Sequence, residues 1–131
     1  MFGSSFNPVN AYAKVGVDSA VTSADPHRLI LLLFEGAESA IALAKTAIEQ
    51  QNQQAKTQAI GKAIDIINDG LNVSLNREAG GDLAHKLSTL YDYMCSRLLY
   101  ANLKSNVAAL DEVNGLLQEI HSAWSEIEPQ L

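Results

Sequence analysis

The chain has 131 residues, of which 47% are hydrophobic, and this length suits one domain with a single core. A net charge of −6 argues against nucleic acid or an anionic membrane surface as the main partner. The single cysteine, Cys95, cannot form an internal disulfide, which fits a reducing compartment. No apolar run reaches the ~20 residues of a membrane span, and we find no secretory signal. These features predict a folded protein of the cytosol without membrane insertion.

Residues 1–24 are rich in Gly, Ser, Asn and Ala and show no sustained hydrophobic period. Their apolar side chains are scattered, so one short helix near Val9 to Val15 is the most regular structure that we expect there. The sequence therefore predicts a mobile N-terminal arm or cap over residues 1–24, followed by a helical domain over residues 25–128.

The first predicted helix has more apolar surface than one packing face requires. Asp25 and Pro26 form an N-cap and a first helical position, and the helix should run from there to about Gln50. The six consecutive apolar residues at 29–34 cover its whole circumference, whereas a surface helix needs a stripe only ~100° wide. We therefore expect this helix to be covered on several sides.

Three further helices are predicted at about residues 56–75, 82–104 and 107–127, with a glycine turn at 76–81 and a break at Ser105-Asn106. The second helix carries two adjacent apolar stripes that span about 200°: Ile60, Ile64, Ile67, Leu71 and Leu75, then Ala59, Ala63, Ile66, Gly70 and Val73. The third and fourth helices carry one stripe each: Leu83, Leu87, Leu90, Met94, Leu98 and Ala101, then Val107, Leu110, Val113, Leu117, Ile120, Trp124 and Ile127. Short polar loops between helices of this length predict an all-α fold, an antiparallel up-down-up-down four-helix bundle.

The sequence offers little support for catalysis or for a cofactor. Asp82 and His85 stand at i and i+3, but a metal site in such a bundle needs two Glu-x-x-His pairs, and no second pair exists. The histidines and the Glu35–Glu38 pair are interpreted as solvated, and Cys95 as a core residue. We therefore predict no enzyme activity, no cofactor and no metal.

The tyrosines are the more informative polar residues. Tyr91 and Tyr93 are about 200° apart on the helical wheel, so only one can face the core. Tyr93 and Tyr100 share a face beside the core stripe, where tyrosine serves equally well as a boundary residue or as an interface residue. Tyr12 is an aromatic residue in the predicted arm and should have a place to dock.

Several motifs together resemble the family of flagellar secretion chaperones called FliS. They are "DPHRLILLLFEGA" after "AYAKV", the turn "NREAGGDLA", "LYDYM", "ANLKSN", "LDEV" and Trp124, in this order from about Tyr12 onwards. The resemblance implies a cytosolic chaperone that binds the disordered C-terminal segment of flagellin, prevents premature polymerisation and helps deliver flagellin to the type III export gate. It also implies that the arm, with Tyr12, covers part of the client site, and that the export-gate protein FlhA and the anti-sigma factor FlgM are further partners.

We predict that the apolar surface left over on the arm and on helices two to four contacts the client. The residues chosen are Tyr12, Val15, Ile66, Leu71, Val73, Tyr93, Tyr100, Val113 and Leu117. Replacing Ile66 and Val73 together by Asp should then weaken client binding and leave the bundle helical. Two alternatives are a self-associating structural bundle, which solution mass would reveal, and a metal-dependent bundle enzyme, which would contain bound metal.

Overall fold

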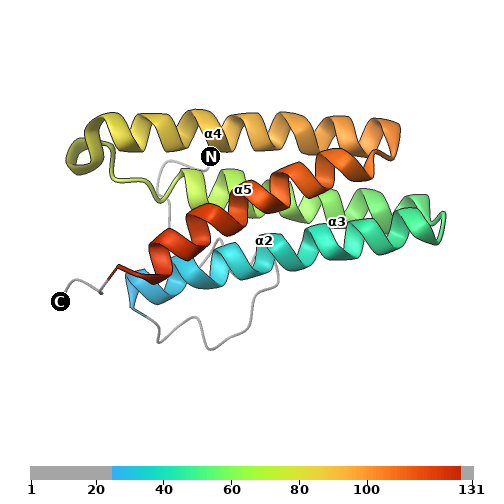
Figure 1. Ribbon diagram of the computed structural model, residues 1–131, viewed down its shortest axis with the longest axis horizontal. Coiled ribbons are helices and arrows are strands. Elements are labelled where there is room, and N and C mark those ends of the chain that lie inside the picture. The colour runs from blue at the N-terminus through green and yellow to red at the C-terminus, as the bar shows by residue number, and fades with distance from the viewer. Residues whose placement is uncertain (1–24, 128–131) are drawn as a thin grey trace, which may run out of the picture.

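The computed structural model describes residues 25–127, so the predicted arm, with Tyr12 and Val15, lies outside the described residues. Within this range the chain forms helices and no strand. They are α2 (Pro26–Glu49), α3 (Gln53–Asp65) continuing into η2 (Ile66–Asn72), α4 (Arg77–Lys104) and α5 (Val107–Ser125). Figure 1 shows that each helix runs opposite to the one before it. The predicted all-α, antiparallel four-helix bundle is confirmed.

Side-chain caps fix three of the helix starts. The Asp25 carboxylate accepts a hydrogen bond from the Arg28 amide at 2.8 Å, ahead of Pro26 at the first helical position. Asn52 and Asn106 cap α3 and α5 in the same way, at 3.0 Å and 2.8 Å. Because caps are local sequence signals, the starts at Asp25 and Asn106 were predictable, whereas α3 begins three residues earlier than the predicted position at 56.

The second half of helix two departs from the prediction of a continuous α-helix. Residues Ile66–Asn72 form a π-helix, whose hydrogen bonds join residues five apart and so widen the turn. The wider turn brings Asn72 to the inner side, where its side chain is buried and donates to the Asp92 carboxylate at 3.2 Å. It also places Gly70 directly against Leu33 of α2, where an added Cβ would lie only 2.9 Å from a Leu33 methyl carbon.

The start of α4 also differs from its predicted position at Asp82. A helical turn begins at Arg77, and Gly81 then interrupts the helix with φ 51° and ψ −126°. The predicted glycine break is therefore real but lies inside the element, because glycine adopts a positive φ without steric cost. Leu83 follows this kink and is 65% exposed, so its assignment to the core stripe of helix three was wrong.

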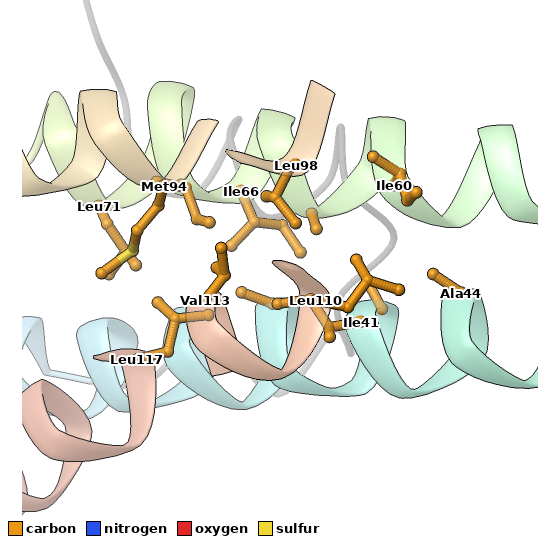
Figure 2. Close-up of a cluster of buried hydrophobic side chains, with 14 of the residues drawn as sticks. Ile41, Ala44, Ile60, Ile66, Leu71, Met94, Leu98, Leu110, Val113 and Leu117 are labelled. Atoms are coloured by element: carbon orange, nitrogen blue, oxygen red, sulfur yellow. The ribbon is translucent and has the colours of Figure 1, made fainter. Parts of the chain in front are cut away.

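Every helix contributes to one core, which Figure 2 shows in its central part. Of the six consecutive apolar residues in α2, Leu29, Leu33 and Phe34 are buried and the other three are half-buried. Further along α2 the buried positions are mostly small, with one large residue, Ile41, among four alanines: Ala37, Ala40, Ala44 and Ala47. Because α2 packs against α3, η2 and α5, the expectation that it is covered on several sides is confirmed.

The contact between Gly70 and Leu33 provides a stability test. We expect Gly70→Ala to lower the free energy of unfolding by about 1–3 kcal/mol relative to Gly61→Ala, because the new methyl group overpacks the buried Leu33 side chain. Gly61 lies in the same helical run but has open space around it, so Gly61→Ala should be neutral or stabilising by up to ~1 kcal/mol. Urea denaturation of both variants measures the difference, and equal effects would contradict the packing account.

Candidate partner-binding surface

Two histidines join α2 to α5 by contacts that the solvated interpretation missed. The His27 ring stacks on Trp124 with ring centres 5.2 Å apart, and its Nε2 donates to the Trp124 carbonyl at 2.9 Å. In return, the Trp124 indole donates to the His27 carbonyl at 3.1 Å. The interpretation of His27 as solvated was therefore wrong, and Trp124 is a half-buried residue at the edge of the core.

The second of these contacts involves His121 and Phe34. The two rings stack with centres 5.4 Å apart, and His121 Nδ1 donates to the Glu38 carboxylate at 2.8 Å. The solvated interpretation was therefore wrong for His121 and Glu38 as well, whereas His85 and Glu35 are exposed as expected. Among residues 25–127 no three His, Cys, Asp or Glu side chains are placed to hold a metal ion.

An apolar groove opens at the end of the bundle where these aromatic residues lie. Its volume is about 490 Å³. We call it the end groove. Its walls come from α2, the η2–α4 connection, the first half of α4 and the end of α5. The lining residues are Ile30, Phe34, Leu71, Ser74, Leu75, Asn76, Gly80, Leu83, Ala84, Leu87, Tyr91, Ile120 and Trp124. Most of this lining is hydrocarbon or aromatic, so the groove is suited to an apolar side chain or an amphipathic segment rather than to a charged ligand.

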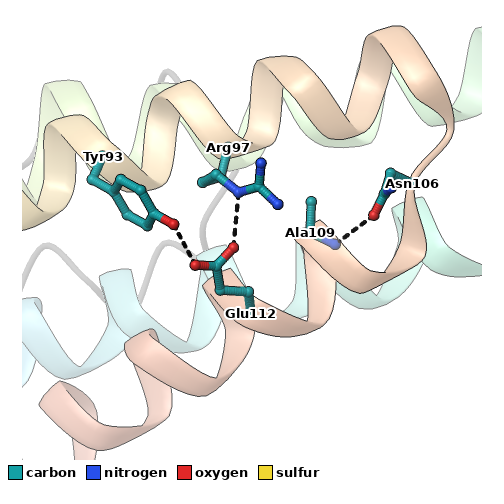
Figure 3. Close-up of polar contacts among 5 residues, drawn as sticks. All are labelled: Tyr93, Arg97, Asn106, Ala109 and Glu112. Atoms are coloured by element: carbon teal, nitrogen blue, oxygen red, sulfur yellow. Dashed lines mark hydrogen bonds and ion pairs between the residues drawn. The ribbon is translucent and has the colours of Figure 1, made fainter.

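A polar cluster connects α4 to α5 along one side of the bundle (Figure 3). The Tyr93 hydroxyl and the Arg97 Nε both donate to the Glu112 carboxylate, the latter at 2.8 Å. The Arg97 guanidinium also lies 4.8 Å from the centre of the Tyr100 ring. The hydrogen bond from Tyr93, followed by that from Arg97, lowers the pKa of Glu112, so the Glu112 carboxylate stays ionised at neutral pH.

The predicted client contacts divide into exposed and buried residues. Val73, Tyr93 and Tyr100 are 46%, 44% and 40% exposed, and are therefore accessible to a partner. The other four described positions are at most 2% exposed and pack inside the bundle (Figure 2): Ile66, Leu71, Val113 and Leu117. Their predicted place on the surface was wrong, because a helical wheel gives the width of an apolar stripe and not which neighbour covers it.

Several exposed apolar residues were missed by the sequence interpretation. Leu99 and Leu103 are 61% and 78% exposed and stand one turn apart on α4. Leu43 of α2 is 61% exposed, and Leu83 borders the end groove. Their spacing could have predicted this exposure, because Leu99 and Leu103 fall outside the core stripe of α4 and belong to no other predicted stripe.

Comparisons with known proteins identify the family of this chain. The family described as "Flagellar protein FliS" matches residues 8–131. The flagellar secretion chaperone FliS of Salmonella typhimurium is 51% identical over 122 residues, covering 93% of this chain and 90% of that protein. FliS of Escherichia coli K12 is 46% identical, covering 88% and 85%, and FliS of Bacillus subtilis 168 is 36% identical, covering 92% and 85%.

A four-helix bundle with an open apolar groove and exposed leucines belongs to the class of helical binding proteins, here the flagellar export chaperones. This chain is a member of the FliS family. Membership of a chaperone family implies a non-enzymatic role. None of the helices between residues 25 and 127 has the length and apolar content of a membrane span.

The different burial of Ile66 and Val73 predicts different outcomes for the same substitution. Ile66→Asp places a carboxylate in the core and should lower the free energy of unfolding by more than about 3 kcal/mol. Val73→Asp changes an exposed position and should stay within about 0.5 kcal/mol of the parent. Because Ile66 is buried, we now expect the double variant to lose stability instead of keeping the parent's helical fold. Thermal unfolding followed by circular dichroism measures both single variants, and equal losses would contradict the assigned burial.

Cys95 gives a pH-dependent test of the α3–α4 contact. Burial, aided by the carboxylates of Asp92, Asp69 and Asp65, raises the pKa of the thiol to about 11. Because the thiolate is the reactive form, alkylation by iodoacetamide at pH 8 should be at least ~10-fold slower in the folded chain than in the urea-unfolded chain. The folded rate should keep rising towards pH 11, and a plateau near pH 9 would contradict this environment.

Proposed function

We propose that the chain is an export chaperone for flagellin. It binds the disordered C-terminal segment of flagellin in the cytosol, prevents premature polymerisation, and helps deliver the subunit to the type III export gate. The observation that carries this proposal is the open end groove, in a chain that belongs to the FliS family. Apolar surface that a folded bundle leaves uncovered is typical of a partner site.

Because the client is long, contacts in the end groove alone cannot offset the entropy that the client loses when it becomes ordered. Ordering a segment of about 40 residues costs on the order of 40 kcal/mol of backbone conformational entropy. At ~25 cal/mol per Å², offsetting that cost requires well over ~1,500 Å² of buried apolar area. We infer that the client fills the end groove and continues over neighbouring helices, where Val73, Tyr93 and Tyr100 are accessible.

We propose that the chain before α2 regulates access to this site. Since Ile30 and Phe34 line the end groove, the segment that precedes Pro26 starts within about two turns of it. We propose that residues 1–24 form an arm that covers part of the groove, with Tyr12 and Val15 as its contacts, and that the client displaces it. FlhA and FlgM are the further partners proposed for this chain.

Self-association is the second candidate, because Leu43, Leu99 and Leu103 are exposed on the outside of the bundle. Light scattering at micromolar concentration distinguishes the two functions. A monomer that becomes a 1:1 complex with the client supports the chaperone, whereas a stable dimer that dissociates in the Leu99→Gln, Leu103→Gln variant supports self-association.

Titration calorimetry with a C-terminal flagellin peptide of about 50 residues tests the chaperone proposal. We expect tight 1:1 binding with a negative heat-capacity change, because apolar burial is coupled to folding of the peptide. Leu83→Gln at the rim of the end groove should weaken binding at least ~5-fold through lost apolar contact.

Leu43→Gln is the matched control, because Leu43 is equally exposed but lies on α2 away from the end groove. It should bind the flagellin peptide like the parent. No heat at two temperatures would contradict the proposed function, and equal weakening by Leu83→Gln and Leu43→Gln would contradict the location of the site.

A further inference from the structure

A second uncovered apolar surface lies far from the end groove. Leu99 and Leu103 are 61% and 78% exposed at successive turns near the end of α4. Leu83, which borders the end groove, precedes Leu103 by 20 residues on the same helix, so ~30 Å separates them at 1.5 Å per residue. The two surfaces therefore lie towards opposite ends of α4, and one short segment cannot fill both.

The leucine pair lies on the side of α4 that faces α3. Thr57 of α3 donates to the Asn102 side chain at 3.2 Å, and Asn72 of η2 donates to Asp92 at 3.2 Å. These two hydrogen bonds mark the α3–α4 seam on either side of Leu99. Gly61 of α3 has open space around its Cα, so a partner can approach that part of the seam closely.

Carboxylates gather next to this leucine pair. Asp92 precedes Leu99 by two helical turns, and Cys95 lies between them, one turn from each. Asp65 and Asp69, at the end of α3 and in η2, act electrostatically on Cys95 together with Asp92. The negative charge therefore borders the leucine pair at its Asp92 end.

Lys56, the buried cation at this seam, already has its hydrogen-bond partners at the end of α4. Lys56 is only 5% exposed, and its ammonium group donates to the Asn102 carbonyl and the Ser105 hydroxyl, both at 2.8 Å. Lys56 thus binds the C-terminal end of α4, where a positive charge interacts favourably with the helix dipole. By contrast, the exposed Leu43 on α2 has Lys62 as a neighbour in the lining of two adjoining hollows.

We propose that Leu99, Leu103 and the neighbouring exposed carboxylates of Asp65 and Asp92 form a docking site for a cationic amphipathic helix of a second partner. Two apolar side chains of that helix, three or four residues apart, cover the leucine pair, and its Lys or Arg residues face the carboxylates. Charge complementarity selects this occupant over an acidic helix of equal hydrophobicity. The inference does not depend on flagellin being the client of the end groove.

The probe for this site is a capped 14-residue helical peptide of Leu and Lys, compared with a peptide in which Glu replaces every Lys. Fluorescence anisotropy at low salt should show at least ~10-fold tighter binding of the Lys peptide, with the difference shrinking as salt screens the charges. Equal binding of the two peptides would overturn the proposal.

Variants that keep the fold distinguish this site from general attraction to an acidic protein. Leu99→Gln with Leu103→Gln leaves the net charge unchanged and should weaken binding of the Lys peptide at least ~10-fold. Asp65→Asn, at an exposed position at the end of α3, should weaken it about threefold. Leu43→Gln, next to Lys62, is the control and should bind like the parent.

Two results would overturn the proposal even if the Lys peptide binds. The first is equal weakening by Leu43→Gln and by the double leucine variant, which would show unspecific attraction. The second is displacement of the Lys peptide by a saturating flagellin C-terminal segment, which would make the leucine pair part of the client surface. Unchanged thermal unfolding of all three variants confirms that the fold is intact.

Discussion

The close contact of α2 with its neighbours is the constraint on which the bundle depends. From Ala37 to Ala47 most buried positions of α2 are alanines, with Ile41 as the one large side chain among them, so the neighbouring helices can pack closely there. Gly70 likewise allows close packing in η2, because it contacts Leu33 and leaves no room for a Cβ. Towards the start of α2 the inner residues become large, with Leu33 and Phe34, and the end groove opens beside them. We infer that the predominance of alanine in the middle of α2 allows close helix packing there, whereas the large residues near its start lie beside the open end.

Polar contacts between distant segments fix the register of the helices around this core. His27 and Trp124, 97 residues apart, exchange two hydrogen bonds and stack their rings. Lys56 binds the end of α4 from α3, and a buried Asn72 reaches Asp92. Each contact satisfies a polar group that packing would otherwise leave without a partner. The open groove and the exposed leucines are therefore features of a well-determined fold rather than signs of loose packing.

Local signals in the sequence predicted a large part of this fold, and contacts between distant residues account for what they missed. The caps at Asp25 and Asn106, the glycine break and the opposite orientations of Tyr91 and Tyr93 all follow from local geometry, and the structure confirms them. The π-helix was not predictable, because hydrophobic periodicity assumes a fixed turn of 3.6 residues. The π-helix also buries the polar side chain of Asn72, which no apolar stripe of the sequence contains.

The candidate site was less predictable than the fold, for a physical reason. Ile66 and Val73 share one apolar stripe on the wheel, yet one is fully buried and the other is 46% exposed. Which of them a neighbour covers depends on how the helices are placed in three dimensions. Tyr93 and Tyr100 lie outside the core stripe of α4 and are exposed, and their contact with a client stays a prediction.

Hydrogen exchange of the backbone amides, with and without the flagellin C-terminal segment, tests the central claim most directly. The claim is that the client covers surface that the folded bundle leaves open. We predict added protection in the segments that line the end groove, residues 71–91 and 120–124, while the slowest amides of the core keep their rates. Faster exchange in the core around Ile66, Val113 and Leu117 on binding would contradict the account. It would mean that the client opens the bundle and binds the residues buried inside it.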